Sequence, residues 1–396
     1  MGKQEASVVD YLVSKKEYLF ILFITIFAVL IRVSVFNYNT TDDYITFLHP
    51  WYEQIDRYGG LPALRHQVGN YSITYQFFIA LFTYLPGKDL FWYKSFSAFF
   101  DFVLALSAGR LCQLISNSES KKFFIFTYAI VLFLPTVVFN SSLWAQCDSI
   151  YVSFILMSII NLLNRKYKTS FALLGVALAF KLQTIFILPF FILVYAIRKS
   201  FSCSYFLISI VSFYLCCLPG FIYGRSLFDP IKIYMNQSDS MPSLNVGYPN
   251  FSGLFGIINA NEAQLWMLHR FLMFLTLAVL CIGLMIVFEY ERNFSKLELV
   301  YLALWINWTC VMFLPNMHDR YGFFIDLLLV LLSIATKNRL MTILATISII
   351  NSFIVYCEYI FGLQYHLLVL SYIAVIIYMI FSLQLYRIVT NPTKES

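Results

Sequence analysis

Long apolar runs separated by short polar or charged segments recur along this chain of 396 residues. A helix needs about 20 consecutive apolar residues to cross the hydrocarbon core of a bilayer. The pattern therefore predicts an all-α polytopic membrane protein of about 12 transmembrane helices, in which residues 1–396 form a single integral membrane domain. The expected spans are 18–36, 91–115, a third ending near 140, a fourth ending near 165, two short pieces that meet near 181, and then 201–219, 265–289, 297–314, 322–336, 340–361 and 366–386.

Two long polar segments, at about 37–89 and 220–264, lie between these runs. Within the first, Ser72–Leu85 looks like a helix but is short for a full span. Its flanks, Arg65-His66 and Lys88-Asp89, fit one side of a membrane. These features predict an interfacial helix that lies on the outer surface.

The basic residues indicate how the spans are oriented. Lys15 and Lys16 precede the first run, and further clusters follow at alternate turns, among them Lys121-Lys122 and 165–168. Cytoplasmic loops of membrane proteins carry an excess of Lys and Arg. We therefore expect a multi-pass protein of the cytoplasmic (plasma) membrane with both termini in the cytoplasm and both long polar segments outside. The first run is too long for a signal peptide and lacks a small-residue cleavage site, so we expect a retained span.

Composition supports this class and excludes others. Hydrophobic residues make up 60% of the chain and charged residues 12%, whereas an average soluble domain is about 25% charged. The net charge of +6 comes from Lys and Arg spread over short loops, so no nucleic acid partner is expected. The eight cysteines lie mostly inside apolar runs without ligand spacing, and we assign them neither disulfides nor a metal.

Four groups of polar residues fall on the outer side of this topology or at its margin. They are the pair Asp42-Asp43 after the first span, the turn Trp144–Asp148, Lys181 with Gln183, and His318–Arg320. Ionisable groups near a membrane are costly and tend to mark function. We therefore expect the four groups to share a cavity that faces outward.

Each group also has a purely structural explanation. Asp42 and Asp43 fit a helix cap or a solvated loop pair. The turn Trp144–Asp148 fits an interfacial aromatic residue followed by the N-cap of the next span. The sequence favours this structural explanation and a functional one equally. Lys181 fits a snorkelling side chain, although its apolar neighbours favour function. The turn 314–321 is hardest to explain in this way, because Pro and Asn alone would make a turn.

Four short motifs follow one another along the chain. After an Asp-rich motif come Trp-x-Gln-x-Asp-Ser at 144–149, Phe-Lys-x-Gln at 180–183 and Met-His-Asp-Arg-Tyr at 317–321. In this order and topology the chain resembles bacterial membrane proteins related to the GPI-anchor mannosyltransferase that adds the second mannose, and more widely the GT-C glycosyltransferases. The resemblance covers essentially the whole chain and implies a GT-C-like fold. Asp319 stands where Glu is commoner, and Cys147 occupies a variable place; both bear on the substrate more than on the reaction.

The resemblance implies a hexosyltransferase that takes one sugar from a polyprenyl-phosphate donor at the outer leaflet. The acceptor would be a hydroxyl of a cell-envelope polysaccharide or glycolipid. Such enzymes are typically inverting, with a carboxylate of the first outer loop acting on the acceptor, which makes Asp42 or Asp43 the candidate base. The reaction itself also needs cations at the leaving phosphate, and we expect Lys181, His318 and Arg320 to bind it. The residues expected to position substrates are Gln146, Asp148, Gln183, Asp319 and Tyr321.

The adjacent carboxylates of Asp42 and Asp43 can have different roles, because like charges repel and a nearby cation favours the charged form of only one. We expect one to be the base and its neighbour to orient substrate or a cation. No cofactor is expected. A divalent metal is compatible with carboxylate oxygens, but no further ligand set is visible. The many Tyr and Phe residues are expected to belt the membrane interface rather than to stack on sugars.

Other classes of protein share the polytopic architecture. A polysaccharide or lipid-sugar transporter should have interrupted helices in matching halves, and the sequence indicates one interruption, near Lys181. A lipid-linked oligosaccharide polymerase would use a lipid diphosphate oligosaccharide instead of a single-sugar lipid monophosphate. A scaffold protein would have no use for clustered His, Asp, Arg and Lys on one face, so the transferase is the favoured interpretation.

Overall fold

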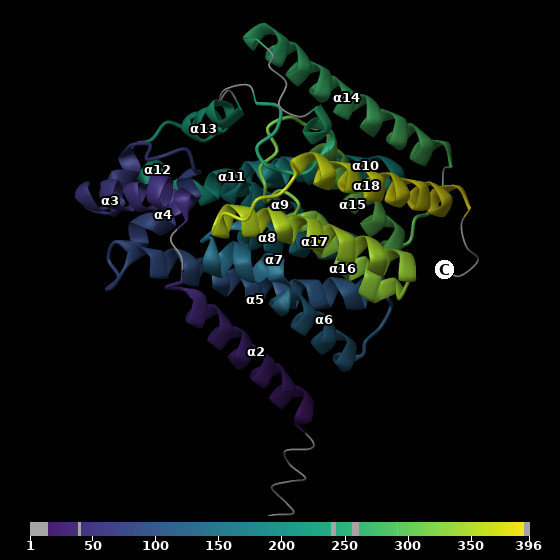
Figure 1. Ribbon diagram of the computed structural model, residues 1–396, viewed down its shortest axis with the longest axis horizontal. Helices are drawn as coiled ribbons and strands as arrows, with labels where there is room; N and C mark the ends of the chain where they lie inside the picture. Colours follow the sequence, from purple (N-terminus) through teal and green to yellow (C-terminus); the bar gives the residue numbers. More distant parts are fainter. Residues whose placement is uncertain (1–14, 39–40, 239–242, 256–260, 291, 392–396) are drawn as a thin grey trace, which may run out of the picture.

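The computed structural model describes residues 15–38, 41–238, 243–255, 261–290 and 292–391 (Figure 1). It is 78% helical, which confirms an all-helical architecture. In the described ranges six helices are long and apolar enough to cross a membrane, or seven when one bent pair counts as a single span. Further apolar helices of 10–17 residues lie where other spans were expected. The multi-pass membrane class is therefore confirmed, and the full number of about 12 spans stays a prediction.

The N-terminal part combines one long helix with a group of short ones. α2 (Lys16–Val35) forms the first expected span and buries little of its surface. The short helices that follow are η1 (Tyr44–Leu48), α3 (His49–Arg57), η2 (Leu61–Arg65) and α4 (Ile73–Phe82). α4 begins where the Ser72 hydroxyl accepts a hydrogen bond from the Tyr75 backbone, and it matches the predicted interfacial helix in place and shortness. In Figure 1, α3 and α4 lie at the left end, opposite the C-terminus.

The next elements contain a sharp bend. They are α5 (Asp89–Ile115), α6 (Lys121–Phe133), α7 (Pro135–Val138), η3 (Phe139–Leu143) and α8 (Asp148–Leu163). The apolar run from α6 to η3 is bent by 53° at its break. Pro135 explains the bend, because its ring clashes with the preceding turn and it has no N–H to donate. This interruption was not predicted, so the chain has a second broken helix besides the one at Lys181.

The predicted break at Lys181 is confirmed. Lys181 is in an extended conformation and separates α9 (Tyr167–Phe180) from η4 (Leu182–Ile187), which leads into α10 (Leu188–Arg198). α11 (Tyr205–Cys216) then packs closely on α9, where a Cβ on Gly175 would lie 2.1 Å from the Ser209 carbonyl oxygen. Small residues permit this close approach of helices in membranes.

The C-terminal half adds the remaining helices around the central body. They are α12 (Leu218–Ile222), α13 (Asp229–Ser238), η5 (Phe251–Phe255), α14 (Glu262–Glu289), α15 (Lys296–Phe313), α16 (Phe323–Thr336), α17 (Arg339–Phe361) and α18 (Leu367–Thr390). α14 lies along the upper edge of Figure 1 and α2 along the lower edge. Both helices expose most of their apolar side chains, as helices do when lipid covers them.

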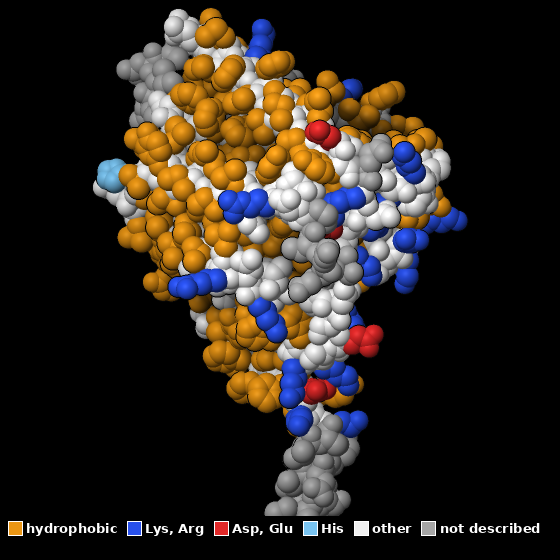
Figure 2. Space-filling model, turned by 90° about the vertical axis from the view of Figure 1, so that its right-hand side faces the viewer, with side chains coloured by type: hydrophobic (Ala, Val, Ile, Leu, Met, Phe, Trp, Pro, Cys, Tyr) orange, Lys and Arg blue, Asp and Glu red, His pale blue; other side chains and the backbone are white. Residues whose placement is uncertain are grey.

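The two ends of the helical body differ in charge. Figure 2 looks at the end that carries the C-terminus, where Lys and Arg side chains are spread over the face and acidic ones are few. α6 begins at this end with Lys121, α8 ends beside Arg165, and α16 ends beside Lys337. The predicted motif residues lie at the other ends of the same or neighbouring helices, which separates them from the basic loops.

Candidate functional site

The four predicted polar groups meet at one cavity of about 1030 Å³. They come from the helical segment after α2, the turn before α8, the break between α9 and η4, and the connection from α15 to α16. Seven of the ten predicted site residues line the cavity: Asp43, Gln146, Lys181, Gln183, His318, Arg320 and Tyr321. Asp148 and Asp319 lie behind this lining, where they contact Lys181 and Arg320.

Asp43 is held in the cavity wall through its Oδ2 atom. Trp144 Nε1 donates a hydrogen bond to it at 2.8 Å, and Gln146 Nε2 donates another at 2.6 Å. The backbone N–H of Asp43 donates to the Tyr359 hydroxyl at 2.9 Å. Within the described segment 41–238, the Asp43 side chain does not cap its own helix, so the capping explanation is wrong for Asp43.

Asp42 lies differently. Its side chain is exposed and is not part of the cavity lining. Successive side chains on a helix point about 100° apart, so only one of the two adjacent residues can face the Trp144 turn. The structure directs Asp43 into the cavity and Asp42 away from it.

Trp144 is a buried residue of the site rather than an interfacial aromatic residue. Its side chain is 0% exposed and stacks on Tyr359, with ring centroids 4.1 Å apart. The Arg320 guanidinium lies 5.5 Å from the centre of the Trp144 ring. The interfacial explanation of this turn is therefore wrong, because the indole contacts Asp43, Tyr359 and Arg320 and not solvent.

Lys181 forms an ion pair with Asp148. Its Nζ donates to Asp148 Oδ1, while Asn140 Nδ2 donates to Asp148 Oδ2 at 2.8 Å. The two charged side chains are only 7% and 1% exposed. The snorkelling explanation of Lys181 is wrong, because its ammonium turns toward a buried carboxylate. The Asp148 carboxylate accepts hydrogen bonds from Lys181 and Asn140 and does not cap α8.

Arg320 lies among three carboxylates. The oxygens nearest its guanidinium are Asp319 Oδ1 at 3.4 Å from Nη1, Asp43 Oδ2 at 3.8 Å from Nη1, and Asp148 Oδ2 at 3.8 Å from Nε. Within the described part of the chain, Arg320 Nε has no hydrogen-bond partner. A buried guanidinium with an unused N–H is well suited to bind a phosphate or carboxylate oxygen.

Burial sets the protonation of the motif turn. It lowers the pKa of His318 to about 3, with further lowering by Arg320 and Lys181, so the imidazole is neutral at neutral pH. Burial also raises the pKa of Asp319 to about 6, against the opposing effect of Arg320, and raises the pKa of Tyr321 to about 12. At the leaving phosphate, where His318 was expected, a neutral ring can donate a hydrogen bond but has no acidic proton to give.

A segment of the second long polar stretch holds this turn in place. The Val246 N–H donates to the Met317 carbonyl at 3.0 Å, and the Asp319 N–H donates to the Val246 carbonyl at 3.0 Å. The Tyr365 hydroxyl in turn donates to the Gly247 carbonyl at 3.1 Å. Gly247 has φ +90°, and a Cβ there would lie 3.2 Å from Asp319 Cβ. The polar stretch therefore fixes the position of Asp319 beside Arg320.

Gln183 and Tyr321 contact each other in the cavity wall. Gln183 Nε2 donates to the Tyr321 hydroxyl, and Gln183 Oε1 has no partner within the described residues. Both side chains line the cavity. The amide oxygen is therefore available to accept a hydrogen bond from a substrate hydroxyl.

Sequence reasoning missed an aromatic and amide wall. Tyr71 lines the cavity and donates from its hydroxyl to Gln146 Oε1 at 3.5 Å. Its ring packs on Trp51, with centroids 5.2 Å apart, and Trp51 also lines the cavity. Tyr71 was predicted to belong to the interface belt. The available signal was the polar run Gln67–Tyr71 directly before the short apolar helix.

A buried network supports the site from behind. Asp101 of α5 accepts hydrogen bonds from Arg32 Nε at 2.8 Å, Ser141 Oγ at 2.6 Å and Ser149 Oγ at 2.5 Å. The two serines flank the Trp144 turn. Arg32 Nη2 also donates to the Leu132 carbonyl at 3.0 Å, beside the bend that Pro135 causes. The network thus ties α2, α5, η3 and α8 together.

The carboxylates of the site face cations of the chain itself. In the ranges that the structure describes, no group of three or more His, Cys, Asp or Glu side chains is placed to hold a metal ion. Arg320 and Lys181 instead contact the carboxylates of the cavity and of the layer behind it.

Comparisons of the sequence with protein families and with curated proteins give no match. The function is therefore inferred from the chemistry of the cavity and from the sequence motifs that line it.

Proposed function

We propose that this protein is a membrane glycosyltransferase of GT-C-like fold that moves a single sugar from a polyprenyl-phosphate donor to a hydroxyl of a cell-envelope polysaccharide or glycolipid. The observation that carries the proposal is the meeting of Asp43 and Arg320 in one cavity, with carboxylate and guanidinium 3.8 Å apart. Transfer from a lipid phosphate to a hydroxyl needs a base for the hydroxyl proton and a cation for the leaving phosphate. These two residues supply both.

Asp43 acts as the base in the proposed reaction. The acceptor oxygen attacks the anomeric carbon of the donor while its proton passes to the carboxylate. The bond from that carbon to the phosphate oxygen breaks as the new bond forms, and the lipid phosphate leaves with the electron pair. The configuration of the sugar inverts. Because Trp144 and Gln146 both hold Oδ2, we assign the proton to Oδ1.

Arg320 binds the donor phosphate through its unused Nε–H and through Nη1. The Nη1 contact to Asp43 is long, so a phosphate oxygen at hydrogen-bond distance replaces it. Lys181 was also expected to bind the phosphate, but in this proposal it neutralises Asp148. The other oxygen of Asp148 lies 3.8 Å from Arg320 Nε. His318 lines the cavity and donates a hydrogen bond as a neutral ring.

The rest of the cavity suits a lipid-linked sugar. One part of its lining is apolar and consists of Leu178, Leu182, Ile185, Phe186, Ile231, Ile233, Met273 and Leu314. Another part carries amides and aromatic faces, including Asn70, Tyr71 and Gln183. The volume of about 1030 Å³ lies at the upper end of the roughly 300–1,000 Å³ of common small-molecule sites, which suits a sugar phosphate with the first part of its lipid.

The charge distribution supports an extracytoplasmic site. Lys and Arg side chains are spread over the end of the body that carries the C-terminus (Figure 2), and such residues are enriched on the cytoplasmic side. The cavity lies at the other helix ends. We therefore place both termini in the cytoplasm and the cavity at the outer face of the plasma membrane, with the shorter apolar helices completing about 12 spans.

A lipid-sugar transporter and a polymerase remain the rival functions. Within the residues that the structure describes, the helix breaks at Leu134 and Lys181 both fall in the first half of the chain, whereas transporters repeat such breaks in matching halves. A polymerase differs in its donor. The assay below separates all three functions.

Purified protein in lipid vesicles is incubated with radiolabelled polyprenyl-phosphate sugars, mannose first, and with membrane acceptors. Asp43→Asn is expected to lower the transfer rate about 100-fold or more, the usual contribution of a general base. Asp42→Asn is the matched control and should retain the rate, and Arg320→Lys should raise the KM for the donor because it loses bidentate binding. Full transfer by Asp43→Asn refutes the base assignment. Transfer only from lipid diphosphate oligosaccharides identifies a polymerase, and movement of the donor without a new glycosidic bond identifies a transporter.

A further inference from the structure

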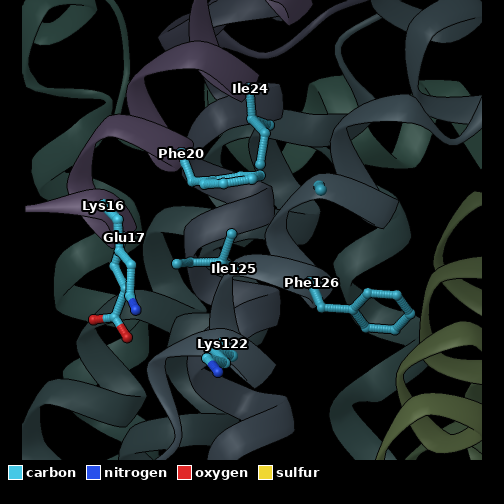
Figure 3. A pocket seen from close by; sticks show the side chains of 8 residues that line it. Lys16, Glu17, Phe20, Ile24, Lys122, Ile125 and Phe126 are labelled. Atoms are coloured by element: carbon cyan, nitrogen blue, oxygen red, sulfur yellow. The ribbon is translucent and has the colours of Figure 1, made fainter. Parts of the chain in front are cut away.

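A second cavity lies between α2 and α6, on helices that do not line the candidate site. Its volume is about 410 Å³. In Figure 3, Phe20 and Ile24 of α2 and Ile125 and Phe126 of α6 form its apolar part, while Lys16, Glu17 and Lys122 lie toward one end. It is therefore a cleft with a hydrocarbon wall and a charged mouth.

Contacts on both sides of the cleft hold the two helices apart at a fixed spacing. Beyond the apolar part, Thr25 Oγ1 hydrogen-bonds to the Tyr128 hydroxyl at 2.9 Å. At the mouth, Lys121 Nζ lies 3.6 Å from Glu17 Oε2. Between these contacts the helices leave the cleft open, and Phe20 and Phe126 remain mostly exposed beside it. The cleft therefore opens sideways, toward the lipid that surrounds α2.

The mouth is positively charged. Lys16, Lys121 and Lys122 lie there together with Glu17. Both helices also begin at this end, since α2 starts at Lys16 and α6 at Lys121, and helix N-termini carry partial positive charge. Lys15 and Lys121 lie over the Tyr18 ring, 5.8 and 5.5 Å from its centre, whereas Lys16 and Lys122 line the cleft itself.

We propose that this cleft binds an anionic phospholipid, with its phosphate at Lys16 and Lys122 and one acyl chain against Phe20, Ile24 and Phe126. The helical distance from Lys16 to Ile24 is about 12 Å, which fits within one leaflet of a hydrocarbon core about 30 Å thick. Basic side chains at a membrane surface attract anionic lipids. The apolar wall thus matches an acyl chain and the cationic mouth matches a phosphate, and an anionic phospholipid carries both. A soluble anion has no apolar part for the wall.

The test measures lipid retained by the full-length protein. The protein is reconstituted in phosphatidylcholine vesicles that contain phosphatidylglycerol, extracted in mild detergent and examined by native mass spectrometry. Lys16→Gln with Lys122→Gln is expected to weaken phosphatidylglycerol binding about 30-fold, which corresponds to about 1 kcal/mol for each lysine. Lys166→Gln with Lys168→Gln removes the same charge from exposed positions and is expected to have little effect. Equal losses in the two double variants overturn the proposal.

A third variant tests the acyl chain. Ile125→Trp fills the cleft without changing its charge, and it is expected to lower retention as strongly as loss of the lysines. Unchanged retention in Ile125→Trp means adsorption to surface charge alone and overturns the site, as does equal retention of phosphatidylcholine. On the unaltered protein, photoactivatable phosphatidylglycerol is expected to crosslink to α2 and α6. Crosslinks confined to other helices overturn the proposal without any variant.

Discussion

Lys181→Met separates two possible uses of the Lys181 ammonium, neutralisation of Asp148 and binding of a donor phosphate. Asp148 is buried, and Lys181 is the cation that contacts its Oδ1. After the substitution Asp148 keeps the hydrogen bond from Asn140 at 2.8 Å and the Arg320 Nε at 3.8 Å. A buried carboxylate is thereby left with a weaker set of partners.

The expected loss follows from this geometry. Removal of one partner from a buried ion pair costs about 3–5 kcal/mol of folding free energy, and the distant Arg320 places Lys181→Met at the lower end, about 3 kcal/mol. Asp148→Asn in the same chain removes the stranded charge while its amide oxygen still accepts from Asn140. The double variant is therefore expected to be more stable than Lys181→Met, with a coupling of about 2 kcal/mol in the double-mutant cycle.

The assay is reversible denaturant unfolding in detergent, combined with the donor KM of each variant. Lys168→Met is the matched control, because Lys168 lies exposed on α9, the helix that ends at Lys181, and exposed substitutions change stability by about 0.5 kcal/mol or less. If Lys181→Met unfolds like this control, or if the two single losses simply add, Lys181 does not neutralise Asp148. If Lys181→Met instead keeps its stability and has a raised KM for the donor, Lys181 binds the donor phosphate.

Two further predictions concern the cavity wall. Burial raises the pKa of Asp319 to about 6, so its contribution to stability is intact below about pH 4 and lost as the pH rises through about 6. Asp319→Asn is therefore expected to be at least as stable as the native chain at about pH 8 and to lose that advantage only as the pH falls through about 6 to about 4; a difference in unfolding free energy that does not vary with pH would contradict this. Gly69 has φ +66°, and a Cβ there would lie 2.2 Å from Trp51 Cε2. Gly69→Ala should therefore displace Trp51 and cost about 1–3 kcal/mol, seen as lower stability and altered tryptophan fluorescence; an unchanged spectrum and stability would refute it.

Helix placement was largely predictable because apolar length is visible in the sequence. The expected spans at 18–36, 91–115 and 340–361 match α2, α5 and α17 closely, and the break at Lys181 follows from a charge inside an apolar run. The bend before Pro135 was missed, since neighbouring helices let membrane helices tolerate proline. A proline alone therefore does not show whether a span is straight or broken.

The site was predictable as a set of segments but not as a set of contacts. Topology brings the four motifs to one end of the body, because each lies at a helix end on that side. Which of Asp42 and Asp43 enters the cavity depends on the rotation of one short helix, which composition does not encode. The pairing of Lys181 with Asp148 depends on how α8 and α9 pack. Tyr71 was missed because an aromatic residue before an apolar helix fits the interface as well as a cavity.

The Arg32–Asp101 pair has a consequence for biogenesis. Its members are 69 positions apart, so α2 enters the bilayer with a guanidinium whose carboxylate has not yet been synthesised. Arginine inside a membrane helix costs about 2.5–3.5 kcal/mol at its centre, and Arg32 lies close enough to the end of α2, at Val35, to reach the interface meanwhile. Arrival of α5 completes the pair, and Ser141 and Ser149 then dock on Asp101. The Trp144 turn therefore reaches its final conformation only after α5 has entered the membrane and Asp101 is in place.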